Sequence, residues 1–258
     1  MIKSVVPFFT SEYSIGESVL TLKAKGKSLE HGPRSIVDLA LKTGLDKVFL
    51  VENTMSGFLT AYTNLSAAKI QLCFGLKIVV CQDAAVKNDE SRNTESKVII
   101  FANGSDGYYN LLKIWNEAAT TNFYYYPRTD SKSIAKHWDK KNVSLCLPFY
   151  SSFLANNTLS LSECMFDYSF ATTFFSWEES GLPFDNLLRN RVENYAKSNS
   201  LPVVKTRSIY YDTYEDFEAF SVFRCIQNRS TLDKPDLNHF SSNKFCFQEF
   251  LKQNELPE

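Results

Sequence analysis

The sequence predicts an α/β fold in which repeated βα units build a mostly parallel sheet. Short apolar runs of strand-like composition alternate with longer segments whose apolar residues recur at helical spacing. The alternation extends over most of the 258 residues, and no glycine-rich phosphate loop, internal repeat or low-complexity linker interrupts it. Units of this kind form either a closed barrel or an open, doubly wound sheet, and we favour the barrel.

Local patterns predict the individual elements. The segment 35–44 carries apolar residues at helical spacing and ends in glycine, which predicts a helix, and the apolar run 47–51 predicts the strand that follows. The segment 82–96 is polar and charge-rich without apolar periodicity, which predicts a surface loop. The same reasoning predicts further helices over 57–68, 108–120 and 184–198, and further strands over 4–9, 78–81, 97–102, 143–147, 170–175 and 202–206.

The composition favours one domain with one large core, because 44% of the residues are hydrophobic and 14% are aromatic. A formal net charge of −1 gives no general attraction to phosphate backbones or anionic membranes. The longest apolar stretches are far shorter than the ~20 residues of a membrane helix, and residues 1–9 lack the pattern of a secretory signal. We therefore expect a cytoplasmic protein with no membrane partner. The six cysteines form no C-x-x-C pair, so we expect reduced core residues.

Seven segments, in order, resemble one known family. The segment 10–14, Thr-Ser-Glu-Tyr-Ser, resembles the His-Ser-Glu-Tyr-Ser that opens the polymerase and histidinol phosphatase (PHP) domain of bacterial DNA polymerase III alpha subunits. Six further segments resemble the sequence of the same family: 35–45, 105–115, 123–130, 201–206, 215–219 and 225–233. The resemblance implies a distorted (β/α)7 barrel, here a stand-alone PHP-like domain over residues 1–258, in which 228–258 is the C-terminal extension that leads toward the palm domain in the family.

The resemblance also implies a rim where active relatives hold a trinuclear metal cluster. Ammonium groups repel metal cations and phenyl rings offer no lone pair, so the residues at several of these positions cannot hold such a cluster. The three histidines, His31, His137 and His239, fall at none of the ligand positions and are expected at the surface. We therefore expect no catalytic residue, no metal and no cofactor. The rim positions are Phe8, Thr10, Glu17, Glu52, Asn53, Lys77, Lys97, Phe149 (with an uncertainty of one residue), Ser208 and Tyr210.

Charge pairing is our hypothesis for what fills this rim. Lys77 and Lys97 would supply fixed positive charge where metals lie in active relatives, and each would pair with Glu17 or Glu52 because a buried carboxylate without a partner is costly. The alternative is that both lysines point outward on a solvated rim.

An aromatic run offers a second candidate contact, to nucleic acid or to a protein. Tyr124, Tyr125, Tyr126 and Arg128 carry rings and a guanidinium plane that can stack on unpaired bases. The same run is also compatible with ordinary packing on the barrel. We favour packing, since the net charge gives no electrostatic attraction.

The leading functional hypothesis is a non-catalytic binding or scaffolding domain in DNA replication, a pseudoenzyme that docks on a polymerase, on a proofreading exonuclease or on single-stranded DNA. One alternative is a residual phosphoesterase or 3′–5′ exonuclease with a site rebuilt around Glu17, Glu52, Asn53 and Ser208. Another is the PHP part of a split C-family polymerase. A reduced version of this kind is compatible with a phage or mobile element as its source.

Overall fold

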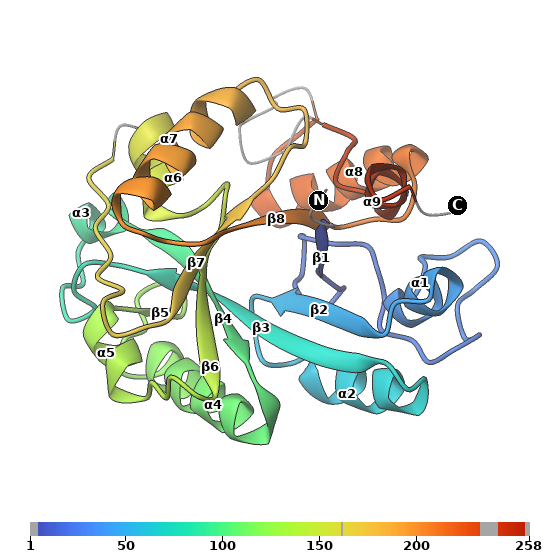
Figure 1. Cartoon of the computed structure of the whole chain (residues 1–258), viewed down its shortest axis with the longest axis horizontal. Helices are drawn as coiled ribbons and strands as arrows, with labels where there is room; N and C mark the ends of the chain where they lie inside the picture. Colours follow the sequence, from blue (N-terminus) through green and yellow to red (C-terminus); the bar gives the residue numbers. More distant parts are fainter. Residues whose placement is uncertain (1–4, 161, 233–241, 256–258) are drawn as a thin grey trace.

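A closed ring of strands organises the molecule, as the computed structural model shows for residues 5–160, 162–232 and 242–255 (Figure 1). Neighbouring strands pair in the order β2-β1-β8-β7-β6-β4-β3, and pairing of β3 with β2 closes the ring. The predicted barrel is thus confirmed, with seven strands in the ring within the described residues. The ring consists of β1 (Val6–Phe9), β2 (Lys47–Glu52), β3 (Gln71–Val80), β4 (Ser96–Ala102), β6 (Val143–Leu147), β7 (Thr173–Trp177) and β8 (Val203–Ile209).

One strand departs from a purely parallel barrel. β4 runs antiparallel to both of its neighbours, β3 and β6, whereas the other pairs of the ring are parallel. The connection from β3 to β4 contains only a one-turn helix, α3 (Asp89–Arg92), and provides no crossover helix of the kind that parallel neighbours need. A short strand, β5 (Arg128–Thr129), pairs with β3 outside the ring.

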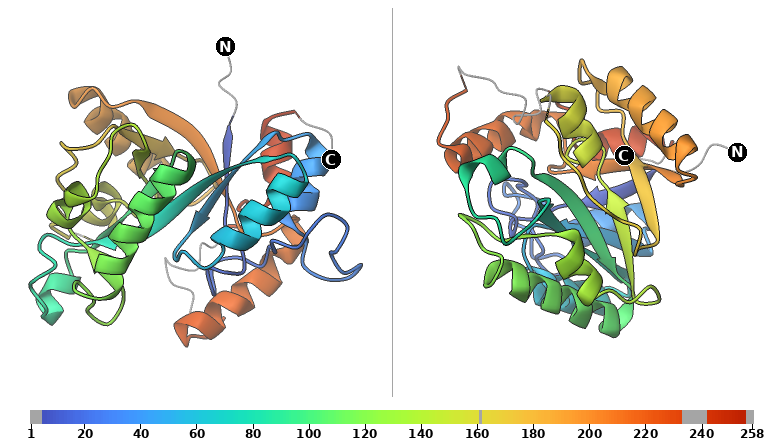
Figure 2. Two further views of the ribbon diagram at one scale, coloured as in Figure 1. Left: turned by 90° about the horizontal axis from the view of Figure 1, so that it is seen from below. Right: turned by 90° about the vertical axis from the view of Figure 1, so that its left-hand side faces the viewer.

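The larger helices lie outside the barrel, as Figure 2 shows from two further directions. The ends of α1 have a local cause, because the Ser35 hydroxyl accepts from the Val37 amide and Gly44 adopts φ 68° at the C-terminus. The helices are α1 (Ile36–Thr43), α2 (Phe58–Ala67), α4 (Gly104–Ala119), α5 (Ser131–Lys136), α6 (Phe153–Leu159), α7 (Asp185–Ser198), α8 (Phe217–Asn228) and α9 (Phe247–Gln253).

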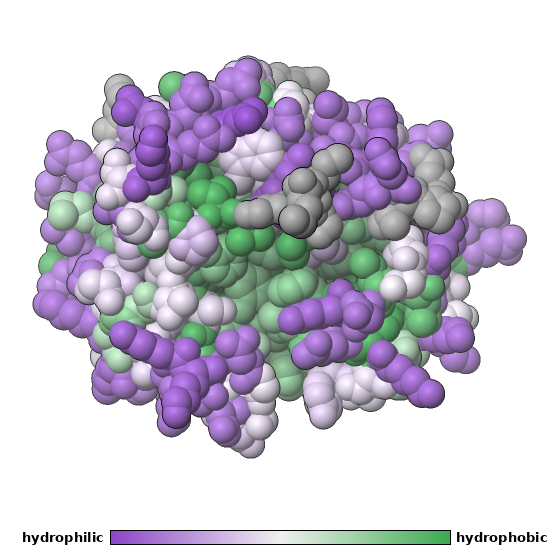
Figure 3. Space-filling view, viewed as in Figure 1, coloured by the Kyte–Doolittle hydropathy of each residue, from purple (hydrophilic) through white to green (hydrophobic). Residues whose placement is uncertain are grey.

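Successive side chains along each strand point alternately into and out of the barrel, and this alternation creates two apolar layers. Inward side chains form a small cluster inside the barrel, made by Phe8, Val51, Cys73, Ile99, Phe101 and Cys146. Outward side chains such as Leu50 and Ile100 join a larger cluster beneath the helices. In the view of Figure 3, hydrophobic surface appears at the hollowed centre of the face, and hydrophilic residues surround it. The barrel interior is therefore filled toward one end by packed side chains rather than open throughout.

Most of the predicted elements are present, with shifted ends. The predicted strand 78–81 covers only the end of β3, which begins at Gln71 and ends at Val80, and the predicted strand 170–175 begins later, at Thr173. The predicted loop 82–96 contains α3. All six cysteines are buried and none forms a disulfide, as expected. His239 lies outside the described residues, as do 233–241 and 256–258 of the predicted extension 228–258. Within the described residues, no helix is long and apolar enough to cross a membrane.

Candidate functional site

A pocket of about 600 Å³ opens at the C-terminal ends of the parallel strands. Thr10 follows β1, Asn53 follows β2 and Phe149 follows β6, so three separate strands deliver residues to one rim. Antiparallel β4 contributes instead from its N-terminal end, where Lys97 faces the later part of β3. Nine of the ten rim positions expected from sequence line this pocket: Phe8, Thr10, Glu17, Asn53, Lys77, Lys97, Phe149, Ser208 and Tyr210.

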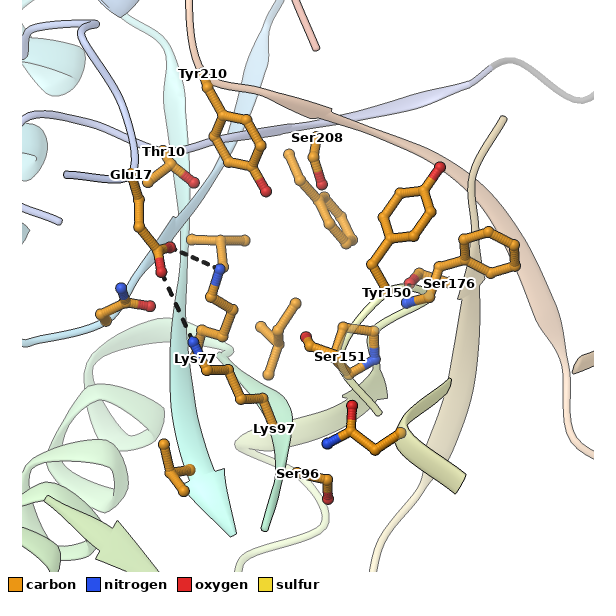
Figure 4. A pocket seen from close by; sticks show the side chains of 18 of the residues that line it. Thr10, Glu17, Lys77, Ser96, Lys97, Tyr150, Ser151, Ser176, Ser208 and Tyr210 are labelled. Carbon is orange, nitrogen blue, oxygen red and sulfur yellow. Dashed lines mark hydrogen bonds and ion pairs between the residues drawn. The ribbon is translucent and has the colours of Figure 1, made fainter. Parts of the chain in front are cut away.

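Glu17 lies between two lysines in this pocket (Figure 4). Its Oε2 accepts a hydrogen bond from Lys77 Nζ at 2.8 Å, and its Oε1 lies 3.7 Å from Lys97 Nζ. Burial acts to raise the pKa of Glu17, but the two ammonium charges outweigh it and hold that pKa far below its usual range. The lysines thus point into the pocket rather than outward, and the predicted pairing with Glu17 is confirmed.

The predicted pairing of the lysines with Glu52 is wrong. Glu52 aligns with Leu76 across the β2–β3 pair, one residue before Lys77, so its side chain projects to the opposite face of the sheet. There it is fully buried and accepts from the Ser11 amide at 3.0 Å and from the hydroxyls of Ser11 and Ser14. Burial raises the pKa of Glu52 to about 7, although these hydrogen bonds act to lower it. Glu52 therefore fixes the segment that follows β1 and does not line the pocket.

A second acidic residue, which the sequence analysis missed, does line the pocket. Glu178 directly follows β7 and accepts from the Ser208 amide at 2.9 Å and from the Ser208 hydroxyl at 2.8 Å. Burial raises its pKa, while Ser208 and the nearby Arg207 act to lower that pKa. The sequence does show an acidic residue directly after an apolar strand, which could have indicated Glu178. The prediction missed it because it ended that strand at residue 175. Ser208 is thus already engaged as a donor.

The aromatic run only partly forms a surface. Arg128 is fully buried, with its guanidinium 3.1 Å from Glu95 and 4.8 Å from the centre of the Tyr124 ring, so its side chain offers no exposed surface for the possible contact with a partner. The Tyr126 hydroxyl donates to Glu95, and its ring lines the pocket. Tyr125 is 65% exposed. The favoured packing interpretation holds for Arg128 and Tyr126, which leaves Tyr125 as the accessible ring of the set.

The side chains of the pocket do not fit a metal cluster. Phe8, Lys77, Lys97 and Tyr210 occupy four of the positions where the family resemblance places ligands, and none of them offers a neutral imidazole or a carboxylate. Glu17 is the one acidic residue among the nine rim positions that line the pocket, and both of its oxygens face ammonium groups. Across the described ranges, no group of three His, Cys, Asp or Glu side chains is placed to hold an ion. His31 is exposed, and His137 is hydrogen-bonded to Glu117 at 2.8 Å.

Fold and site together define a seven-stranded α/β barrel with a lysine-rich pocket at its C-terminal rim. The PHP domain model matches residues 28–153. The DNA polymerase III alpha subunit of Thermus aquaticus is 24% identical over 198 residues, which are 73% of this chain and 16% of that protein. The alpha subunit of Treponema pallidum is 23% identical over 235 residues, 86% of this chain and 20% of that protein. Residues 28–153 thus match the PHP domain, and the chain is similar to the corresponding part of DNA polymerase III alpha subunits, of which it spans about a fifth of the length.

A solved structure gives a weaker likeness. A crystal structure from Bifidobacterium adolescentis, assigned to a metal-dependent phosphoesterase, superposes with a TM-score of 0.41 at 10% identity, over 79% of this chain and 87% of its own. This similarity is too weak to support an inference about the fold or the function, and the barrel is assigned from the strand pairing alone.

Proposed function

We propose that this chain is a non-catalytic PHP-like domain that acts as a binding or scaffolding module in DNA replication and docks on a replicative polymerase or its proofreading exonuclease. The observation that carries the proposal is Glu17 held between Lys77 and Lys97 in the rim pocket. This ion-pair cluster places two cations where a phosphoesterase of this family would need metal ligands. The relationship to polymerase III alpha subunits supports a replication setting.

The rival phosphoesterase needs a group that can activate water at neutral pH. Without a metal-bound hydroxide, the pocket is left with general acid–base groups, which typically contribute about 10²–10⁴-fold, far less than phosphate-ester cleavage requires. Glu52, one member of the rebuilt site considered from sequence, points away from the pocket. Glu17 is occupied by the lysines, and Ser208 donates to Glu178. These engagements favour binding over hydrolysis.

Hydrolysis assays separate the two functions. Purified protein with added manganese should cleave single-stranded DNA, primer ends and a simple phosphomonoester no faster than a buffer control. Nuclease activity that copurifies with the chain and disappears in Glu17→Gln would overturn the proposal and promote the phosphoesterase.

Direct binding tests the positive part of the proposal. The purified polymerase body of a C-family alpha subunit and the proofreading exonuclease, both from the source organism, are each titrated against the intact chain by biolayer interferometry. We expect saturable binding to at least one of them. Absence of binding to both would contradict the replication role.

Single-stranded DNA is the remaining candidate partner, and Tyr125 is the described residue best placed to contact it. The Tyr125 ring is exposed, and the Arg92 guanidinium lies 4.8 Å from its centre. Stacking on a base is worth about 1–3 kcal/mol, so Tyr125→Ala should weaken any such binding by at least about fivefold. The matched control is Tyr62→Ala, because Tyr62 is also exposed, at 55%, but lies on α2. Equal binding by both variants would exclude the aromatic run as a DNA contact.

A further inference from the structure

The rim pocket carries a surplus positive charge. Lys77 and Lys97 share the single carboxylate of Glu17, at 2.8 Å and 3.7 Å. Two ammonium groups and one carboxylate leave a net charge of +1 on this triad. Figure 4 shows both lysines directed at Glu17 from the neighbouring strands β3 and β4.

Neighbouring carboxylates do not cancel this surplus, because each has a guanidinium nearby. Glu95 pairs with the buried Arg128 at 3.1 Å. Glu178 lies within the electrostatic influence of Arg207, which is also buried, and to a smaller extent of Lys77. The lining also includes Arg224, which lies close enough to influence the charge of both lysines. The surplus on the triad does not depend on that residue.

Lys97 is the member of the triad that an incoming group can reach. Its side chain is 36% exposed, compared with 12% for Lys77, and its distance to Glu17 is the longer of the two. Glu17 acts to raise the pKa of Lys97, but burial and the charge of Lys77, helped by Arg224, outweigh that effect and lower the pKa below its usual value. A second anion beside Lys97 would reverse this imbalance.

The walls of the pocket favour an amphipathic ligand. Apolar surface comes from side chains such as Phe8, Ile99 and Phe149, and hydrogen-bonding groups come from Ser151 and Asn156. The Lys97 amide donates to the Ser151 carbonyl at 2.7 Å, which fixes this wall beside the lysine. A volume of about 600 Å³ lies in the range of pockets that enclose small organic molecules or peptide side chains.

We propose that this pocket binds a monocarboxylate on an apolar body, either a small acid or the carboxylate of a partner peptide, through Lys97. The proposal rests on the non-catalytic function above and names the chemistry that the same site would recognise. A single carboxylate matches the surplus charge of the triad. A phosphate monoester carries a charge of about −1.5 to −2 at pH 7 and would exceed it. Single-stranded DNA brings one charge per nucleotide, whereas the triad offers one surplus charge.

A matched pair of probes tests the carboxylate. N-acetylphenylalanine and N-acetylphenylalanine amide differ in the charged group alone, and each is titrated against the intact chain by NMR or calorimetry. We expect the acid to bind at least tenfold more tightly than the amide. Lys97→Gln should remove that preference and Lys97→Arg should retain it. Lys113→Gln, which removes one exposed lysine on α4, is the charge-matched control and should behave as wild type.

Competition separates the sources of the anion. The competitors are an acidic peptide with a free C-terminal phenylalanine, the same peptide with a C-terminal amide, and a set of small acids. Displacement of N-acetylphenylalanine by the free peptide but not by its amide supports a peptide partner. Displacement by small acids alone supports a metabolite. Equal binding of acid and amide, no binding of either, or unchanged binding in Lys97→Gln would overturn the proposal. Stronger displacement by inorganic phosphate or a thymidine octanucleotide would also overturn it. None of these results depends on hydrolysis or on polymerase binding, so a failure here is distinguishable from a failure of the proposed function.

Discussion

Replacement of Lys77 by methionine removes the shorter ion pair of the pocket while it keeps most of the side-chain volume. Lys77 and Glu17 are 12% and 18% exposed and lie 2.8 Å apart, so the pair is largely screened from water. Loss of one partner of a buried pair typically costs about 3–5 kcal/mol, because the other charge remains buried. Lys97 stays 3.7 Å from Glu17 and offsets part of that cost. We therefore expect Lys77→Met to lower the free energy of unfolding by about 3 kcal/mol.

Urea denaturation of matched variants measures this loss. Lys97→Met should cost about 1 kcal/mol or less, since its pair is longer and more exposed. The loss of unfolding free energy in the double variant Glu17→Gln/Lys77→Met should be smaller than the sum of the losses in the two single variants by at least about 1 kcal/mol, which indicates direct coupling. If Lys77→Met costs less than about 0.5 kcal/mol, the range of ordinary surface substitutions, the assignment of a buried and structurally important triad is refuted.

Two further predictions concern protons and metals. Between pH 4.5 and 7, Glu52 is ionised in the unfolded chain and largely protonated in the fold, so the fold binds more protons and its stability falls as pH rises. The free energy of unfolding of wild type minus that of Glu52→Gln should therefore decline over this window by roughly 3 kcal/mol at most and level off above pH 7. If this difference in unfolding free energy does not change with pH, the pKa of Glu52 is not shifted in the fold. Elemental analysis should find less than one zinc, manganese or iron per chain, and a chelator should leave the melting midpoint unchanged, because the apolar layers rather than an ion stabilise the barrel. A drop of many degrees in chelator would reveal a structural metal.

The sequence predicted elements best where local pattern and tertiary burial agree. The helix over 35–44 was predicted from its apolar spacing and its terminal glycine, and in the structure Gly44 ends α1 while the Ser35 side chain caps its start. The strand 78–81 was placed too late because β3 begins at Gln71, an exposed residue, and contains Gly75, which weakens any local strand signal. The direction of β4 could not be predicted, since strand polarity depends on how the chain crosses the sheet.

Some features of the candidate site could likewise be predicted from the sequence, and others depended on the tertiary structure. At the rim positions that the family resemblance implies, residue types alone argued against a metal cluster, because lysine and phenylalanine cannot replace imidazole or carboxylate. The choice of Glu17 rather than Glu52 as the partner of the lysines depended on strand register, in which a shift of one residue exchanges the two faces of the sheet. Glu178 was missed for a related reason, since its role depends on where β7 ends relative to β8.

The sequence by itself determined that the chain forms helices and strands in alternation and that it contains enough apolar residues for a large core. These properties are local or compositional, so they can be read without knowing which segments meet. Tertiary structure alone decided that both lysines converge on Glu17, that Glu52 is buried on the other face, and that Arg128 is enclosed rather than offered to a partner. Each of these outcomes joins residues more than 30 positions apart, and their meeting depends on closure of the barrel, which no local pattern specifies.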